Sequence, residues 1–247
     1  MNTTENAFHY ATGRAIEAAG AVSKPKYHRY QYDLISKHCG RSVLEVGAGL
    51  GEFAGLFEGR DRVVVTDVDK GAVAFLEEKF ADRPSFEVER LDLDHIDEAD
   101  IAAVESVLAI NVLEHFDDDV ALLRGLARLV RPGGNIVLWV PAFPALYGEF
   151  DRKVGHFRRY TPRTLRDVAL LAGLRPASIR AVNLIGGLAW WAAVRRGGNG
   201  SPDGRLVGIY DRFFVPVSRV LDRVAPVPFG QSVLAVLQVL PDGPRTS

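Results

Sequence analysis

The chain has 247 residues, 47% of them hydrophobic and 25% charged, and these proportions exclude a disordered or collagen-like protein. Its 30 Lys and Arg against 31 Asp and Glu give a formal net charge of −1, which argues against a general nucleic-acid-binding protein. The single cysteine, Cys39, excludes an intramolecular disulfide and a zinc site built from several cysteines.

Short runs of branched apolar residues alternate with helical patterns along the chain. Strands are predicted at 42–46, 62–66, 86–90, 104–110, 136–140 and 232–239, and helices at 53–57, 70–80 and 118–129. A further helix is expected from Thr161-Pro162, a pair that suits the first positions of a helix. Strands alternating with helices of this length predict an α/β fold, with a mostly parallel sheet covered on both faces.

The first predicted strand runs into a loop with glycines at 47, 49 and 51. Glycine lets the backbone turn tightly and approach a ligand, and ligands of open α/β sheets bind at the carboxyl ends of strands. A dinucleotide site requires a third glycine where this chain has Glu52. The E-x-G-x-G-x-G spacing, which begins at Glu45, instead favours a ligand that carries an amino group.

An acidic residue closes the second predicted strand at Asp67, where a carboxylate can accept both hydroxyls of a ribose. Asp69 is a rival for this role, but Asp67 lies nearer the end of the strand. A glycine-rich turn without any ligand remains the alternative interpretation of the loop.

Residues 41–180 resemble the class I S-adenosylmethionine (SAM)-dependent methyltransferases. The glycine loop, Asp67 and the L-E-H sequence at 113–115 carry this resemblance. More narrowly, the chain resembles small-molecule methyltransferases of sugar, glycolipid and natural-product pathways. The resemblance implies a Rossmann-like, doubly wound, seven-stranded sheet, SAM as cofactor and S-adenosylhomocysteine (SAH) as product. The cofactor-binding residues it implies are Glu45, Gly47, Ala48, Gly49, Gly51, Asp67, Val68, Asp92, Leu93, Asn111 and Val112.

Two histidines are candidate catalytic residues, because histidine can accept a proton near neutral pH. His115 follows the fourth predicted strand, and His156 lies in the loop after the fifth. For His115, a packing or capping role is the alternative. The expected substrate-binding residues are Tyr30, Tyr147, His156, Arg159 and Tyr160, although the Arg-Tyr pair could equally anchor the next helix.

No metal is expected, because the end of the fourth strand holds Asn111 and because Glu114 has no evident partner in the sequence. The surplus of Arg and Lys over residues 149–180 is either solvated surface or a means of attracting an anionic substrate.

We expect a methyltransferase that acts on O, N or C of a small organic acceptor, such as a natural product, sugar or lipid-linked intermediate, by in-line displacement. An NAD-dependent oxidoreductase and a non-catalytic SAM-binding protein are the alternatives. The predicted partners include no nucleic acid, and a homodimer is left open.

A single domain is expected over residues 1–247. Its predicted parts are a helical N-terminal lid (1–40), a cofactor-binding core (41–182), a helical substrate-side insert (183–229), and the last strand with a tail (230–247). The aromatic residues of the insert fit an acceptor pocket, a dimer face or a membrane-surface helix. Because the first twenty residues lack the apolar stretch of a secretory signal and no run is long enough to span a bilayer, a cytoplasmic location is expected.

Overall fold

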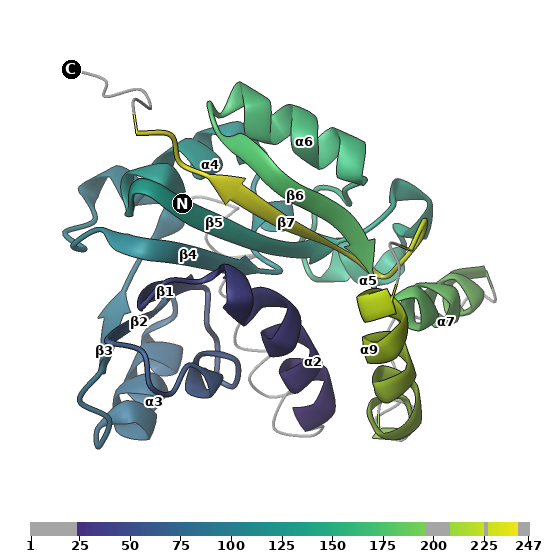
Figure 1. Ribbon diagram of the computed structural model, residues 1–247, viewed down its shortest axis with the longest axis horizontal. Helices are drawn as coiled ribbons and strands as arrows, with labels where there is room; N and C mark the ends of the chain where they lie inside the picture. The colour runs from purple at the N-terminus through teal and green to yellow at the C-terminus, as the bar shows by residue number, and fades with distance from the viewer. Residues whose placement is uncertain (1–23, 196–207, 225–226, 242–247) are drawn as a thin grey trace.

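The computed structural model describes residues 24–195, 208–224 and 227–241 (Figure 1). These residues contain one seven-stranded sheet with the strand order β3-β2-β1-β4-β5-β7-β6. The strands are β1 (Ser42–Val46), β2 (Arg62–Asp67), β3 (Phe86–Arg90), β4 (Val104–Ile110), β5 (Val130–Pro141), β6 (Arg175–Val182) and β7 (Ser232–Gln238).

Most of the sheet is parallel. β1 pairs with β2 and β4, β2 with β3, and β4 with β5, all in parallel register, whereas β7 runs antiparallel to both β5 and β6. The order reverses between β1 and β4, and such a switch point opens a crevice at the carboxyl ends of the strands. The predicted α/β, Rossmann-like sheet is therefore confirmed.

The helices begin where the sequence supplies caps. The side chains of Asp69, Asp118 and Thr161 accept hydrogen bonds from the backbone N–H groups three residues ahead, which stabilises the free N-terminal amides of α3, α4 and α6. The helices are α2 (Pro25–Ile35), α3 (Lys70–Phe80), α4 (Asp119–Arg128), α5 (Glu149–Lys153), α6 (Pro162–Leu171), α7 (Leu184–Arg195) and α9 (Val215–Val224).

Two apolar layers hold the helices on the sheet. On one face, α4 and α6 pack through residues such as Leu123 and Leu165. On the other face, α2 and α3 pack through residues such as Leu34 and Leu76, together with Trp139 of β5. Figure 1 shows these two sets of helices on opposite sides of the sheet, with α7 and α9 side by side at one end. Both faces of the central strands are thus covered, which explains their continuous apolar runs.

Two expectations for local structure differ from what is observed. The predicted helix at 53–57 is a short 3-10 helix, η2 (Ala54–Leu56), in a segment interrupted by Gly55 and by Gly59 at φ +79°. β6 is a strand that the sequence does not predict, because only four of its eight residues are apolar. Across the part of the chain that the structure describes, no helix has the length and apolar character needed to cross a membrane.

Candidate active site

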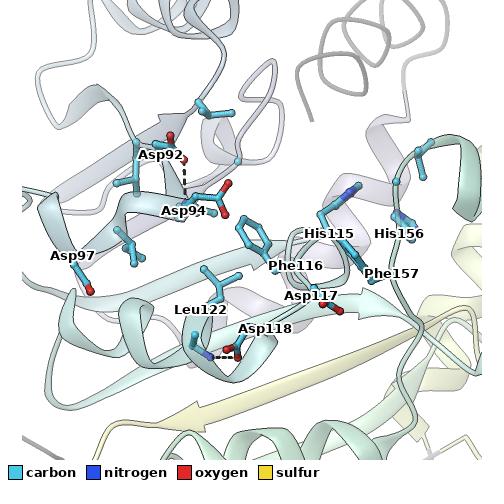
Figure 2. A pocket seen from close by; sticks show the side chains of 18 of the residues that line it. Asp92, Asp94, Asp97, His115, Phe116, Asp117, Asp118, Leu122, His156 and Phe157 are labelled. Atoms are coloured by element: carbon cyan, nitrogen blue, oxygen red, sulfur yellow. Dashed lines mark hydrogen bonds between the residues drawn. The ribbon is translucent and has the colours of Figure 1, made fainter. Parts of the chain in front are cut away.

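A cavity of about 890 Å³ lies beside the carboxyl ends of β1 to β4 (Figure 2). Gly47 follows β1, Val68 follows β2 and Leu91 follows β3, and each lines this cavity. After β4, the short helix η4 (Leu113–His115) contributes His115. This is the edge where an open α/β sheet binds its ligands.

The glycine loop turns through three left-handed residues. Gly47, Gly49 and Gly51 have φ values of 65°, 55° and 61°, a region that residues with a Cβ rarely adopt. The Gly49 N–H donates to Asp67 Oδ2 over 2.8 Å, and the Asp69 N–H donates to Asp67 Oδ1 over 3.0 Å. Asp67, only 2% exposed, therefore ties the loop to the end of β2.

The three glycines serve different purposes. Gly47 lines the cavity. A Cβ on Gly51 would lie 2.5 Å from Leu76 Cδ2 and 2.9 Å from Phe80 Cε2, so Gly51 is required for the packing of α3. A Cβ on Gly49 would meet no protein atom within 4 Å.

Glu45, in β1 just before this loop, has a buried carboxyl group. The residue is 4% exposed, and burial raises the pKa of its carboxyl group to about 8 despite the attraction of Lys79. Its Oε2 has no hydrogen-bond partner among the described residues. A buried carboxylate oxygen without a partner is costly, so this atom is a natural acceptor for a ligand ammonium group.

Three predicted cofactor residues line the cavity at the ends of β2 and β3: Val68, Asp92 and Leu93. The Asp92 carboxylate accepts from the Asp94 N–H over 3.0 Å and lies 3.1 Å from Nδ1 of His95. These contacts hold Asp92 at the rim, where Figure 2 shows it beside Asp94.

Seven of the predicted cofactor residues are not among those that line the cavity: Glu45, Ala48, Gly49, Gly51, Asp67, Asn111 and Val112. The Ala48 N–H donates to the backbone of β2, and Asn111 adopts a left-handed φ of 53°. Val112 is buried, and its Cγ2 would be 3.0 Å from a Cβ placed on Gly47.

His115 and His156 meet at the opposite end of the cavity and both line it. Their ring centroids are 4.7 Å apart and the rings are nearly perpendicular. Burial, and then the neighbouring His156, lower the pKa of His115 to about 4, while a hydrogen bond to the Gly155 backbone opposes this effect. His115 is therefore neutral at physiological pH.

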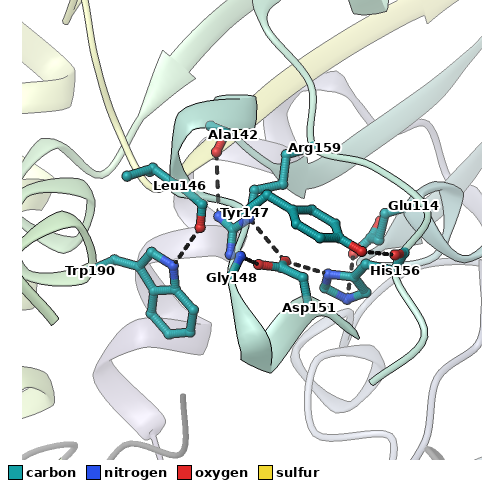
Figure 3. Close-up of polar contacts among 9 residues, drawn as sticks. All are labelled: Glu114, Ala142, Leu146, Tyr147, Gly148, Asp151, His156, Arg159 and Trp190. Carbon is teal, nitrogen blue, oxygen red and sulfur yellow. Dashed lines mark hydrogen bonds and ion pairs between the residues drawn. The ribbon is translucent and has the colours of Figure 1, made fainter. Parts of the chain in front are cut away.

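A network of buried groups fixes His156 (Figure 3). Its Nδ1 lies 2.8 Å from Asp151 Oδ1, and its Nε2 lies 3.8 Å from Glu114 Oε1. Burial favours the neutral form of Asp151, but hydrogen bonds from His156 and Arg159 lower its pKa overall. Because an ionised Asp151 can only accept, Nδ1 of His156 carries a proton, and in the neutral tautomer of the ring the lone pair is then on Nε2.

Sequence analysis missed Asp151 and the role of Glu114. The Asp151 carboxylate accepts a hydrogen bond from the Gly148 N–H at the start of α5. The G-E-F-D sequence can indicate this helix cap, but it cannot indicate the contact of Asp151 with His156. Glu114 has no evident partner in the sequence, yet Glu114, His115 and His156 offer ligand atoms that all lie within 4.8 Å of one another. This proximity removes one of the two reasons for expecting no metal, the lack of a partner for Glu114.

Tyr147, a predicted substrate-binding residue, also lines the cavity. Its hydroxyl donates to the backbone carbonyl of His156 over 2.7 Å, so it fixes the loop that carries this histidine.

The structure places three other predicted substrate residues away from the cavity. Tyr30 is 1% exposed, packs edge-on against Trp139 and hydrogen-bonds to Asp222. Tyr160 is 1% exposed, and its hydroxyl donates to Asp119 Oδ2 over 2.9 Å. Both side chains are committed to the core, which corrects the predictions made for them.

Arg159 requires the same correction. It is 6% exposed, pairs with Asp151 Oδ1 over 2.9 Å and lies over the ring of Trp190. Arg158 pairs with Asp117 and Asp119. These arginines are thus neutralised by the fold, and the predicted attraction of an anionic substrate finds no support in their contacts.

The N-terminal lid and the insert are only partly described. Residues 1–23 lie outside the described residues, as do 196–207 and 225–226 of the insert. No described residue of the 183–229 insert lines the cavity. Trp190 supports the site from behind, since its Nε1–H donates to the Leu146 carbonyl and its ring packs on Phe150.

Comparison with known proteins identifies the domain. Residues 44–136 match the family model described as a methyltransferase domain. The chain therefore contains a methyltransferase domain. The matched segment begins in β1 and ends in β5, so it holds the glycine loop, Asp67 and His115.

Curated relatives of this methyltransferase domain agree with that assignment. A probable S-adenosylmethionine-dependent methyltransferase of Mycobacterium tuberculosis is 32% identical over 116 residues, which are 46% of this chain and 41% of the relative. A cypemycin N-terminal methyltransferase of a Streptomyces species is 36% identical over 132 residues, which are 52% and 51% of the two chains. The chain spans about half or less of the length of these relatives.

Solved structures share the fold of the methyltransferase domain. A SAM-dependent methyltransferase of Archaeoglobus fulgidus superposes with a TM-score of 0.58 at 18% identity, covering 87% of this chain and 94% of the other. Geranyl diphosphate C-methyltransferase of Streptomyces coelicolor was solved with Mg²⁺, geranyl diphosphate and SAH. It superposes with a TM-score of 0.58 at 14% identity, covering 85% of this chain and 77% of the other. The [4+2]-cyclase SpnF superposes with a TM-score of 0.56 at 15% identity, covering 85% of this chain and 80% of the other. The predicted family and cofactor, SAM, are confirmed, but a fold shared with a cyclase does not by itself define the reaction.

Proposed function

We propose that this protein is a SAM-dependent methyltransferase that acts on a small organic acceptor. One observation carries the proposal: the same cavity is lined by the expected cofactor residues Gly47, Val68 and Leu93 and by the two histidines His115 and His156. Its volume of about 890 Å³ lies near the upper end of the range of small-molecule sites, which suits a cofactor and an acceptor together.

The residues present fit this cofactor. The unpartnered, buried Oε2 of Glu45 suits an ammonium group, Gly47 places no side chain at the cavity wall, and the Asp67 carboxylate stands at the end of β2. When bound, SAM supplies an activated methyl group on a sulfonium whose leaving group is a neutral thioether. The protein must therefore chiefly align the acceptor and exclude water. Apolar side chains of Phe116 and Leu122 contribute to the cavity wall.

An acceptor that loses a proton during the reaction needs a base, and His156 is the better placed of the two histidines. Asp151 holds its Nδ1–H and leaves the lone pair on Nε2, whereas burial makes protonation of His115 unfavourable. His115 would then contribute shape and orientation. The relatives include proteins named as a ubiquinone biosynthesis O-methyltransferase and as an N-terminal methyltransferase, so O, N and C all remain in the proposal as the methylated atom.

Calorimetric titration of the purified protein with SAM, SAH and NAD⁺ tests the cofactor. We expect SAM and SAH to bind and NAD⁺ not to bind; tight NAD⁺ binding would favour the oxidoreductase alternative. Production of SAH that depends on an added acceptor then separates an enzyme from a non-catalytic SAM-binding protein.

A matched pair of glycine variants locates the cofactor. Gly49 and Gly59 both have positive φ, and a Cβ added at either would meet open space, but Gly59 lies in the turn before β2. Either change to Ala costs about 1 kcal/mol of stability. We expect only Gly49→Ala to weaken SAM binding, by tenfold or more in the measured dissociation constant. Equal affinities in the two variants would refute the loop assignment.

A further inference from the structure

Three residues at the acceptor end of the cavity form a set typical of a metal centre. Glu114 and His115 come from η4, and His156 comes from the loop after α5. One carboxylate oxygen and one nitrogen from each imidazole lie within 4.8 Å of one another. Two imidazoles and one carboxylate are a ligand set that binds first-row divalent transition-metal ions and leaves open positions for water or substrate.

Glu114 provides an independent observation. The residue is completely buried, and neither carboxylate oxygen accepts a hydrogen bond from another described residue. Its Oε1 lies 3.8 Å from His156 Nε2, which is too far for a hydrogen bond. An isolated buried carboxylate is unfavourable, and coordination of a cation is one of the few arrangements that would satisfy it.

The surroundings orient both imidazoles as metal sites require. Asp151 holds Nδ1 of His156 over 2.8 Å, and the Gly155 backbone hydrogen-bonds to His115. Metal-binding histidines almost always have their second nitrogen held by a carboxylate or a backbone carbonyl. Arg159, paired with the same Asp151 oxygen, holds that carboxylate in place.

We propose that Glu114, His115 and His156 bind one divalent transition-metal ion, such as Zn²⁺, Fe²⁺ or Mn²⁺, at the acceptor end of the cavity. Both histidines line the cavity, so the open positions of the ion would be accessible to an acceptor oxygen. Binding of the ion does not depend on the proposed methyltransferase function.

The role of the ion does rest on the proposed function. A bound divalent ion would lower the pKa of an acceptor hydroxyl that coordinates it. The hydroxyl would then release its proton to solvent. Nε2 of His156 cannot bind metal and act as a base at once. The metal-loaded protein would therefore favour hydroxyl acceptors, whose ionisation the ion assists.

Titration of the metal-stripped, full-length protein with Co²⁺ tests the site without any acceptor. Co²⁺ bound by nitrogen and oxygen ligands at an open site gives visible absorption bands that the hydrated ion lacks. We expect one strong site per chain, competed by Zn²⁺, and at least a 100-fold loss of affinity in both Glu114→Gln and His156→Ala. His95→Ala is the matched control, because His95 also faces a carboxylate, Asp92, but at the exposed rim of the cavity.

Thermal unfolding of each variant shows whether a loss of Co²⁺ binding reflects unfolding. If Glu114→Gln does not fold, the titrations of wild type and His156→Ala still test whether the proposed site binds the ion. The proposal is overturned if the wild-type protein shows no Co²⁺ absorption, or if His95→Ala abolishes it while His156→Ala does not. SAM binding is measured on the same samples. A wild-type protein that binds SAM but no Co²⁺ would contradict this inference alone, and one that binds Co²⁺ but no SAM would contradict the proposed function alone.

Discussion

At the scale of single residues, Glu45 shows how a position can be unfavourable for folding and useful for binding. β1 buries it between apolar strands, with one oxygen left without a partner among the described residues. Burial raises the pKa of its carboxyl group from 4.5 to about 8. Between these two values the folded protein holds the proton more tightly than the unfolded chain, so the free energy of unfolding falls as pH rises through this window.

Replacing Glu45 with Gln removes the ionisable group. The fall in the free energy of unfolding with rising pH that this group causes therefore disappears. From about pH 5 to about pH 9, we expect the free energy of unfolding of Glu45→Gln to rise by about 1–4 kcal/mol relative to wild type. Urea unfolding at several pH values measures the difference. Glu77→Gln, an exposed change on α3, is the control and should show no such trend. Parallel pH profiles for wild type and Glu45→Gln would contradict the burial of this carboxylate.

At the scale of elements, the attachment of α2 depends on a buried polar contact with α9. The Tyr30 hydroxyl hydrogen-bonds to Asp222, and the same carboxylate oxygen accepts from the Asn183 N–H over 2.7 Å. One carboxylate thus joins α2, α9 and the segment between β6 and α7. This contact gives Tyr30 a role in the positions of the helices rather than in substrate binding.

Tyr30→Phe separates these two roles. We expect a loss of about 1–3 kcal/mol in the free energy of unfolding, because a buried carboxylate oxygen loses one of its two hydrogen-bond donors, with no change in SAM affinity or turnover. Denaturant unfolding and SAM titration measure the two quantities. Tyr32→Phe, on the same helix but half-buried, should change stability less. A fall in turnover without a loss of stability would restore Tyr30 as a substrate-contacting residue.

At the scale of the whole molecule, near-neutral net charge conceals an uneven distribution. The cavity is lined by five aspartates, Asp92, Asp94, Asp97, Asp117 and Asp118, and by one basic residue, Arg152. Of the arginines in 149–180, only Arg152 lines the cavity; Arg158 pairs with the cavity residue Asp117 and with Asp119, and Arg159 pairs with the buried Asp151. The field at the cavity therefore favours cations.

SAM carries one more positive charge than SAH, so the two should respond differently to salt. Raising NaCl from about 20 mM to about 500 mM shortens the Debye length from about 20 Å to about 4 Å. We expect the affinity for SAM to fall about two- to fivefold more than the affinity for SAH. Asp94→Asn should reduce this difference, and the exposed Asp82→Asn should not. Identical salt dependence for both ligands would show that the aspartates exert no effective field.

The sequence by itself determined six of the seven strands, the glycine loop and the starts of α3, α4 and α6. These features depend on local causes: apolar runs long enough to be buried on both faces, glycines where φ is positive, and caps such as Asp69. The family resemblance added the predicted cofactor residues at strand ends, four of which, Gly47, Val68, Asp92 and Leu93, line the cavity.

Only the tertiary structure decided which polar residues are free to meet a ligand. Tyr30, Arg159 and Tyr160 look accessible in the sequence, yet each is buried against a distant acid, Asp222, Asp151 or Asp119. Glu114 and His156 are far apart in the chain and come together because η4 and the loop after α5 pack beside the same cavity. Such contacts follow from the packing of whole elements, and no periodicity or spacing within one segment encodes them.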